Sequence, residues 1–242
     1  MTNITLMNAF KNYESYSGRW FAATIILNLV MKLSVEEVQQ RFPSFEAELV
    51  QDIVKVSEIK SCNKGEYILR RGQYIRSVII VFDGLVKVSK ANGNGNYFFL
   101  HYIKGGQAFS LTMTYGPKQE PSEVIAVAFE KTILMAIPLS CMDKWMMEYK
   151  SWYQFVFDTI RNRIKDFLKI IDHIVFLNMN ERLVYYLKLH EEMLHSKNIP
   201  VTKTEIAKEF SSSREVITRL LKQLASKGKI KTHRHYIEII DL

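Results

Sequence analysis

The spacing of apolar residues changes twice along the chain and divides it into three parts. In residues 1–60 the apolar positions recur three and four residues apart, which predicts helices. The clearest run is Ile25, Ile26, Leu29, Val30 and Leu33. Ser34 and Glu37 have the spacing of a capping box that starts a second helix. An amphipathic stretch from Phe45 to Ile59 follows Pro43, so the whole of this first part is predicted to be helical.

From Lys64 to Pro138, short runs of β-branched and aromatic residues alternate with glycine-containing turns. Asp83-Gly84 and Asn92–Gly95 favour the positive backbone angles that tight hairpins require. The strand candidates are residues 67–69, 78–82, 85–88, 97–103, 124–129 and 132–137. Many short strands separated by regular turn signals predict a small β-roll of roughly 75 residues.

After Pro138 the spacing becomes helical again, with a short helix starting near Ser140 and a long one from about Ser151 to Leu177. One face of the long helix carries an apolar heptad stripe without a polar residue. The stripe is Tyr153, Phe157, Ile160, Ile164, Phe167, Ile171 and Ile174. It continues over three heptads and has charges beside it, so it favours a dimer interface. An ordinary core helix remains the alternative.

Three more pairs with capping-box spacing predict three further helices. These pairs are Asn178–Glu181, Thr202–Glu205 and Ser212–Glu215. The first helix is expected to end near His195, and Gly228 has the position of a glycine that ends the last helix. Residues 229–240 alternate between apolar and polar, which predicts a two-stranded wing.

The composition is compatible with a well-packed protein whose positive charge is concentrated near the C-terminus. The chain has 242 residues, of which 48% are hydrophobic, and its formal net charge is +8. Residues 197–236 contain ten Lys or Arg and three Glu. A basic segment around a helical motif favours contacts with phosphates. The alternative is a solvated face that only keeps the protein soluble.

The cysteines and the N-terminal segment indicate a cytoplasmic protein without a membrane span. Cys62 and Cys141 are too few for a disulfide framework and too far apart in sequence to suggest a metal cluster. The apolar run from Trp20 to Met31 is too short to cross a bilayer. It also lacks the cleavage pattern of a signal peptide. We therefore expect no membrane partner and no bound metal.

The order of these parts resembles the Crp/Fnr family of bacterial transcription regulators. The resemblance rests on the motif Lys64-Cys-Asn-Lys-Gly-Glu-Tyr-Ile-Leu-Arg-Arg-Gly72, the strand that ends at Asp83-Gly84, the long helix and the C-terminal winged helix-turn-helix. It covers about residues 50–242. It implies an α+β protein with N-terminal helices and a cyclic-nucleotide-binding-like β-roll in residues 1–150. A dimerisation helix in 151–177 and a winged helix-turn-helix in 178–242 follow.

The resemblance also implies a homodimer that binds double-stranded DNA and acts with RNA polymerase. Ser213-Arg214-Glu215 and Arg219 match, position by position, the recognition helix of the cyclic-AMP receptor branch. The match implies that both arginines contact guanine N7 and O6 and that Glu215 accepts from a cytosine amine, which predicts an inverted repeat of TGTGA-like half-sites. The predicted DNA-contacting set is Thr202, Ser212, Ser213, Arg214, Glu215, Thr218, Arg219 and Lys222.

Ser211 departs from the pattern, because many helix-turn-helix turns have glycine at this position. Serine is small and can hydrogen-bond locally. We therefore expect the turn to persist with modest strain.

The residues that hold cyclic AMP in the family are not matched. The stretch Gly105–Thr112 lacks the expected glutamate, and Glu123 stands near the position of the expected arginine. An acidic side chain there repels a cyclic phosphate, so cyclic AMP binding is not expected. The effector is expected to be another small molecule or absent. A small pocket for an anion is hypothesised from Arg70, Arg71, Tyr102, Ser110 and Thr112.

No cofactor is expected. Two separated cysteines are too few for an iron–sulfur cluster. His101, the only histidine before the long helix, is not enough for a cupin-type metal site, and a lone strand histidine is more often structural than a haem ligand. No nucleophile, base and metal set converges, so the chain is not expected to be an enzyme. The alternative function is a regulatory ligand-binding β-roll module without a DNA-reading role, and the C-terminal helix-turn-helix argues against it.

Overall fold

The computed structural model describes residues 32–91, 97–114 and 121–242. Most of the predicted N-terminal helix around residues 25–33 and the predicted turn Asn92–Gly95 lie outside the described residues. Two short helices, α3 (Val35–Arg41) and α4 (Ala47–Val56), open the described chain. The predicted capping box at α3 is confirmed, since the Glu37 backbone N–H donates to Ser34 Oγ at 3.2 Å.

The helical prediction was wrong at its end, where residues 58–62 form strand β1 (Glu58–Cys62). β1 pairs antiparallel with β8, with Glu58 opposite Ala136 and Cys62 opposite Thr132. These inter-strand hydrogen bonds replace the helical ones, and a helical pattern in the preceding residues could not reveal them.

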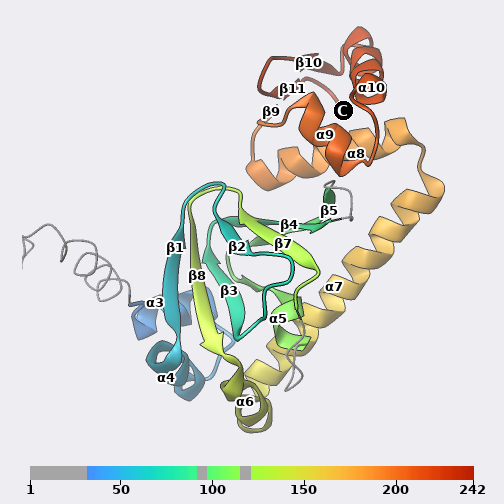
Figure 1. The fold of residues 1–242 in the computed structure, drawn as a ribbon. Helices are drawn as coiled ribbons and strands as arrows, with labels where there is room; N and C mark the ends of the chain where they lie inside the picture. The colour runs from blue at the N-terminus through green and yellow to red at the C-terminus, as the bar shows by residue number, and fades with distance from the viewer. Residues whose placement is uncertain (1–31, 92–96, 115–120) are drawn as a thin grey trace, which may run out of the picture.

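The β-roll consists of two four-stranded sheets, in the orders β1-β8-β3-β6 and β2-β7-β4-β5. The remaining strands are β2 (Tyr67–Leu69), β3 (Ser77–Asp83), β4 (Leu85–Ala91), β5 (Tyr97–Lys104), β6 (Gln107–Ala108), β7 (Val124–Ala128) and β8 (Thr132–Pro138). All six predicted strands are confirmed, and the two sheets lie against each other in Figure 1. Among the strands of the roll, β1 was predicted as helix, and the two-residue β6 was missed because it is too short to show an alternation.

Buried aliphatic side chains fill the interior of the roll, among them Val81, Val86, Val88, Ile103 and Leu134. The short helix α5 (Ser110–Thr114) packs against β3. A second core lies outside the roll, where α3 and α4 cover the β1–β8 side in Figure 1.

A one-turn helix η2 (Leu139–Cys141) and α6 (Met142–Glu148) lead from the roll into α7 (Lys150–Phe176). Trp145 and Trp152 are fully buried in the second core, with ring centroids 5.2 Å apart and nearly perpendicular planes. They anchor the first turns of α7 to the roll. The rest of this 27-residue helix runs diagonally past the roll to the C-terminal unit (Figure 1).

The C-terminal unit contains three helices and a small sheet. Its elements are α8 (Met179–Leu194), β9 (Asn198–Ile199), α9 (Lys203–Glu209), α10 (Arg214–Ser226), β10 (Ile230–Thr232) and β11 (Ile237–Ile239). The predicted wing is confirmed as the antiparallel pair β10–β11, and β9 adds a third strand beside β11. Leu183, Ile206, Ile217 and Leu221 are fully buried between the helices.

Two of the three C-terminal capping predictions are confirmed, at Asn178 and Thr202. The third is wrong by one position, because Ser213 rather than Ser212 caps α10 and accepts from the Val216 N–H at 3.3 Å. The backbone N–H of Ser212 instead donates to the Ala207 carbonyl, which holds Ser212 in the turn.

The predicted glycine at the end of the last helix is confirmed. Gly228 has φ of 72° and follows the C-cap of α10. The Gly228 N–H donates to Ala225 and the Lys229 N–H donates to Leu224, both at 3.0 Å. These two bonds satisfy carbonyls that the helix end leaves free.

Among all helices in the described residues, none combines the length and apolarity needed to cross a membrane.

Candidate DNA-reading helix and the cavity beside it

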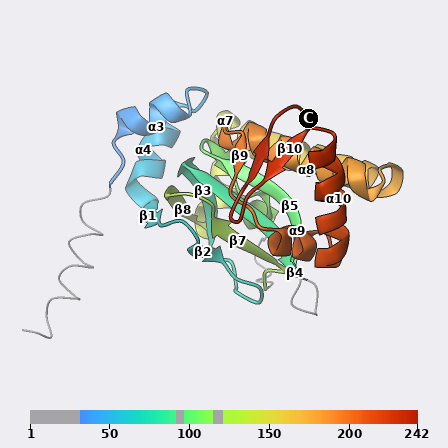
Figure 2. The same ribbon diagram turned by 90° about the horizontal axis from the view of Figure 1, so that it is seen from above.

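Helix α10 has one buried face and one charged, exposed face. Its apolar positions Ile217, Leu220, Leu221 and Leu224 are buried against the rest of the C-terminal unit. Arg214, Glu215, Arg219 and Lys222 are exposed on the opposite side. Seen from above, α10 stands at the edge of the molecule beside α9 (Figure 2). The charged face is therefore accessible to a large partner.

The exposed face of α10 and the start of α9 form an open groove of about 750 Å³, which we call the α10 groove. Its lining is Lys203, Arg214, Glu215, Thr218, Arg219, Lys222, Gln223 and Ser226. Four of these residues are basic and one is acidic. The structure thus brings together five members of the predicted DNA-contacting set in one concave surface.

The other three members, Thr202, Ser212 and Ser213, lie at the helix starts and in the turn. The hydroxyls of Thr202 and Ser213 accept backbone N–H groups and thereby begin α9 and α10. Sequence analysis missed Lys203, Gln223 and Ser226 as groove residues. The signal for Ser226 was present, since it lies four residues after Lys222 on the same helical face.

The N-terminal position of Glu215 keeps its carboxylate charged. Hydrogen bonds from its own backbone N–H and from Ser213 lower the pKa of Glu215. An ionised carboxylate only accepts hydrogen bonds, so Glu215 presents an acceptor in the groove that Arg214 and Arg219 also line. Arginine supplies the complementary donor fork.

The turn between α9 and α10 is closed by Ser211, which has φ of 47°. This is left-handed backbone that non-glycine residues rarely adopt. The Ser211 N–H donates to the Lys208 carbonyl at 3.2 Å. The expectation that serine preserves the turn under modest strain is confirmed.

The β-roll and the C-terminal unit are in direct contact, because α9 lies against β5 and α8 lies across it. Glu209 of α9 is only 8% exposed and forms an ion pair with Lys87 of β4. The ring of Phe99 is 6.2 Å from that of Tyr186, and the ring of Tyr102 is 5.3 Å from that of His190. Polar and aromatic contacts therefore join the two parts.

A β-bulge in the β4–β5 pair decides which side chains reach this contact. The register shifts between Val88 and Ser89, so that Val88 pairs with His101 and Ser89 pairs with Phe99. Tyr102, paired with Lys87, therefore shares the outer face with Phe99. His101 shares the inner side with Val88 and lies beside Phe167 of α7 at 6.4 Å.

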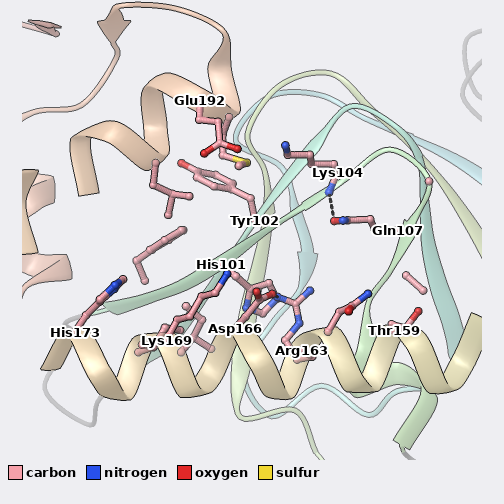
Figure 3. A pocket seen from close by; sticks show the side chains of 18 of the residues that line it. His101, Tyr102, Lys104, Gln107, Thr159, Arg163, Asp166, Lys169, His173 and Glu192 are labelled. Carbon is pink, nitrogen blue, oxygen red and sulfur yellow. Dashed lines mark hydrogen bonds and ion pairs between the residues drawn. The ribbon is translucent and has the colours of Figure 1, made fainter. Parts of the chain in front are cut away.

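A cavity of about 710 Å³ lies between β5, α7 and α8, and we call it the β5–α7–α8 cavity. Figure 3 shows His101 and Tyr102 pointing into it from the strand, with Arg163, Asp166 and Lys169 approaching from α7 and Glu192 from α8. Burial, with Arg163 nearby, lowers the pKa of His101 to about 2, and burial raises the pKa of Tyr102. Both side chains are neutral near pH 7.

The five residues hypothesised as an effector pocket are not brought together. Tyr102 lines the β5–α7–α8 cavity, whereas Arg70 lies over the ring of Tyr67 at 3.9 Å. The Thr112 hydroxyl donates to the Phe109 carbonyl at 2.6 Å and accepts from the Ile79 N–H at 3.0 Å. Ser110 is buried in α5 and Arg71 is exposed on the surface.

Glu123, the acid noted near the expected arginine, forms an ion pair with Lys90 at 2.7 Å. This pairing lowers the pKa of Glu123, so its carboxylate is negatively charged near pH 7. Within residues 32–91, 97–114 and 121–242, no three His, Cys, Asp or Glu side chains gather into a metal site.

Comparison with known families gives two matches in the order that the fold shows. Residues 59–149 match the cyclic nucleotide-binding domain, and residues 181–242 match the Crp-like helix-turn-helix domain. The chain belongs to the Crp/Fnr family. It is a transcription regulator with a β-roll of the cyclic-nucleotide-binding type and a helix-turn-helix, and the Crp/Fnr family is one of regulators rather than enzymes.

The chain is 22% identical to the global nitrogen regulator of Synechococcus elongatus, over 76% of this chain and 86% of that protein. A Crp/Fnr transcriptional regulator from Eubacterium rectale has a similar fold, with a TM-score of 0.71, 20% identity and coverage of 83% and 93%. The c-di-GMP-responsive global regulator CLP of Xanthomonas campestris has a TM-score of 0.70, 16% identity and coverage of 81% and 100%.

Proposed function

We propose that this Crp/Fnr regulator is a homodimer that reads an inverted repeat of TGTGA-like half-sites with its two α10 helices. The observation that carries the proposal is the α10 groove, in which Arg214, Glu215 and Arg219 are exposed on one face. In this proposal each guanidinium contacts guanine N7 and O6, and Glu215 accepts from a cytosine N4 amine. In this proposal Lys222 and Thr218 contact the sugar-phosphate backbone of the DNA beside these bases.

We propose that residues 1–150 form the sensor domain, residues 151–177 the dimerisation helix and residues 178–242 the DNA-binding domain. The effector is proposed to be a small molecule other than cyclic AMP or to be absent, since the negatively charged Glu123 stands near the position where the family resemblance expects a phosphate-binding arginine. RNA polymerase is the proposed further partner at the promoter.

The apolar stripe on α7 supports the dimer. Tyr153, Phe157, Ile164, Phe167 and Ile171 are all exposed, and Ile164 is 54% exposed. Ile160 is half-buried against the second core, which lies outside the β-roll. The side chain of Ile174 lies outside the described residues. Leu168 and Val175 extend the exposed apolar surface. Pairing two copies of α7 would remove this surface from water, which is the main driving force of association.

The proposed function predicts strong discrimination between duplexes. A duplex with two TGTGA half-sites whose centres are about 34 Å apart should place one α10 in each major groove. We expect it to bind about a thousandfold or more tightly than a scrambled duplex. Competition in fluorescence anisotropy at fixed salt measures the ratio. Equal binding of both duplexes would overturn the proposed specificity.

The proposed dimer predicts that a charge on the α7 stripe separates the subunits. Ile164→Glu places a carboxylate in the interface, where burying it without a partner is costly. We expect the wild-type protein to sediment as a dimer and the variant as a monomer in sedimentation velocity. Lys165→Glu adds the same side chain on the same helix, outside the stripe, and should leave the dimer intact. A dimeric Ile164→Glu variant would refute this interface.

A further inference from the structure

We propose that Lys87 and Glu209 are positioning residues, whose ion pair holds the C-terminal unit in one orientation on the β-roll and so fixes where α10 stands. The pair joins β4 of the roll to the last residue of α9. Among the ion pairs of the described residues, it is the one that connects these two parts of the chain. Its consequence for DNA reading rests on the proposed function.

Both members of the pair are largely withdrawn from water. The side chain of Glu209 is 8% exposed and that of Lys87 is 19% exposed. The Lys87 ammonium group also lies 5.7 Å from the centre of the Phe99 ring. In the described part of the chain, Oε2 of Glu209 has no hydrogen-bond partner, so its carboxylate depends on Lys87. Removing Lys87 would leave a buried charge without compensation, which is strongly unfavourable.

The contacts around the pair are between rings and do not by themselves select one position. Phe99 and Tyr102 of β5 lie near Tyr186 and His190 of α8, with ring centroids 5.3 to 6.2 Å apart. Aromatic pairs attract each other over centroid distances of about 4.5–7 Å, so they tolerate small displacements. A shift along β4 by one residue, about 3.4 Å, would instead separate two buried charges. The ion pair therefore selects the orientation.

The position of α9 determines the position of the reading helix, because the two helices share a core. Helix α9 lies between β5 and α10 (Figure 1). Ile206 of α9 and Ile217 and Leu221 of α10 are fully buried in that core. Closely packed interiors transmit displacements, so holding α9 also holds α10. The α10 groove stays open in this arrangement, so the contact positions the reading face without covering it.

In the proposed dimer, the orientation of each C-terminal unit on its roll decides the distance between the two reading helices. The roll itself is anchored to α7 through Trp145 and Trp152. Two half-sites with centres about 34 Å apart require one particular distance. A unit held in one orientation is preorganised for that distance, whereas a mobile unit loses freedom on binding. The ion pair is therefore expected to restrict the half-site spacings that the dimer accepts.

Distances between two spin labels test the orientation in the full-length protein without DNA. The labels are attached at Lys131→Cys on the roll and Lys227→Cys after α10, both exposed positions. Cys62 is buried, and Cys141 is replaced by serine. Mixing with an excess of unlabelled chains leaves one labelled chain per dimer. We expect a single narrow distance distribution by pulsed electron paramagnetic resonance.

Variants of the pair should change this distribution in a charge-dependent way. Lys87→Met should broaden it, because loss of the charge lowers the relative population of the docked arrangement about a hundredfold. Glu209→Gln removes the other charge and should broaden it independently. Lys87→Arg keeps the charge and should keep the distribution narrow. An unchanged distribution in both Lys87→Met and Glu209→Gln, or a broad one in Lys87→Arg, would refute the proposal.

Lys90→Met is the matched control. Lys90 lies on the same strand, but its ion pair with Glu123 is exposed and stays within the roll. The variant makes the same chemical change and should leave the distribution narrow. Equal broadening in Lys87→Met and Lys90→Met would show that the effect arises from damage to β4 rather than from the contact with α9.

The consequence for DNA reading is measured with duplexes that differ in half-site spacing. Wild-type protein should bind the spacing of about 34 Å about tenfold or more tightly than one lengthened by about two base pairs. Lys87→Met should reduce this preference about tenfold and leave binding to a single half-site unchanged. Equal weakening on all duplexes would overturn the positioning role. Absence of any preference for the inverted repeat in wild-type protein would contradict the proposed function, and the label distances would still decide whether the pair holds the C-terminal unit.

Discussion

Replacing Arg214 and Arg219 together by alanine should remove most of the discrimination between a TGTGA-containing duplex and a scrambled one. Each guanidinium is expected to contribute about 1–3 kcal/mol of discrimination, so the double variant should lose about 2–6 kcal/mol per half-site. The reason is geometric. Both side chains are exposed on the same face of α10, and each offers a planar donor fork that matches the two acceptors of guanine.

Lys222→Ala is the control variant. Lys222 lines the same groove, but its ammonium group is a point charge without the planar donor fork of arginine. The variant should weaken binding to both duplexes by a similar factor and reduce the salt dependence of binding by about one ion per half-site. Anisotropy titrations with both duplexes at several salt concentrations separate the two behaviours. Loss of affinity without loss of discrimination in the arginine variant would show that Arg214 and Arg219 contact phosphates rather than bases.

Gly84→Ala should destabilise the β-roll by roughly 2–5 kcal/mol. Gly84 has φ of 94°, which costs an L-residue about 1–2 kcal/mol. An added Cβ would also lie 2.7 Å from the Lys131 carbonyl oxygen and 2.8 Å from Thr132 Cα. Both are backbone atoms that cannot move aside freely, so overpacking adds about 1–3 kcal/mol.

Gly72→Ala separates the two causes, because Gly72 has a similar φ of 79° but open space around its Cβ position. It should cost only the conformational part, about 1–2 kcal/mol. Calorimetric unfolding of both variants measures the difference as a lower Tm of the roll. Equal shifts for the two variants would show that the contact with Lys131 and Thr132 relaxes.

The elements whose signals are local could be predicted from the sequence alone. Helix α7, the wing and the capping boxes at Ser34, Asn178 and Thr202 follow from the spacing of residues close in sequence. A capping hydrogen bond spans three residues and a heptad seven, so these patterns are complete within a short window. The charged face of α10 is of the same kind, since its period fixes which side chains share a face.

Only the tertiary structure decided what depends on residues far apart in the chain. β1 was predicted as helix because the strand that pairs with it, β8, is more than 60 residues away. The ion pair between Lys87 and Glu209 joins positions 122 residues apart. The bulge at Leu100 puts His101 on the face of Val88 and Tyr102 on the face of Phe99, and both residues line the β5–α7–α8 cavity. Such sites depend on strand register and on packing between distant elements. Of the five residues hypothesised for the effector pocket, only Tyr102 lines the cavity. The sequence by itself determined the charged face of α10, because its pattern is local. Only the tertiary structure determined the contact between the β-roll and the C-terminal unit, because that contact joins residues far apart in the chain.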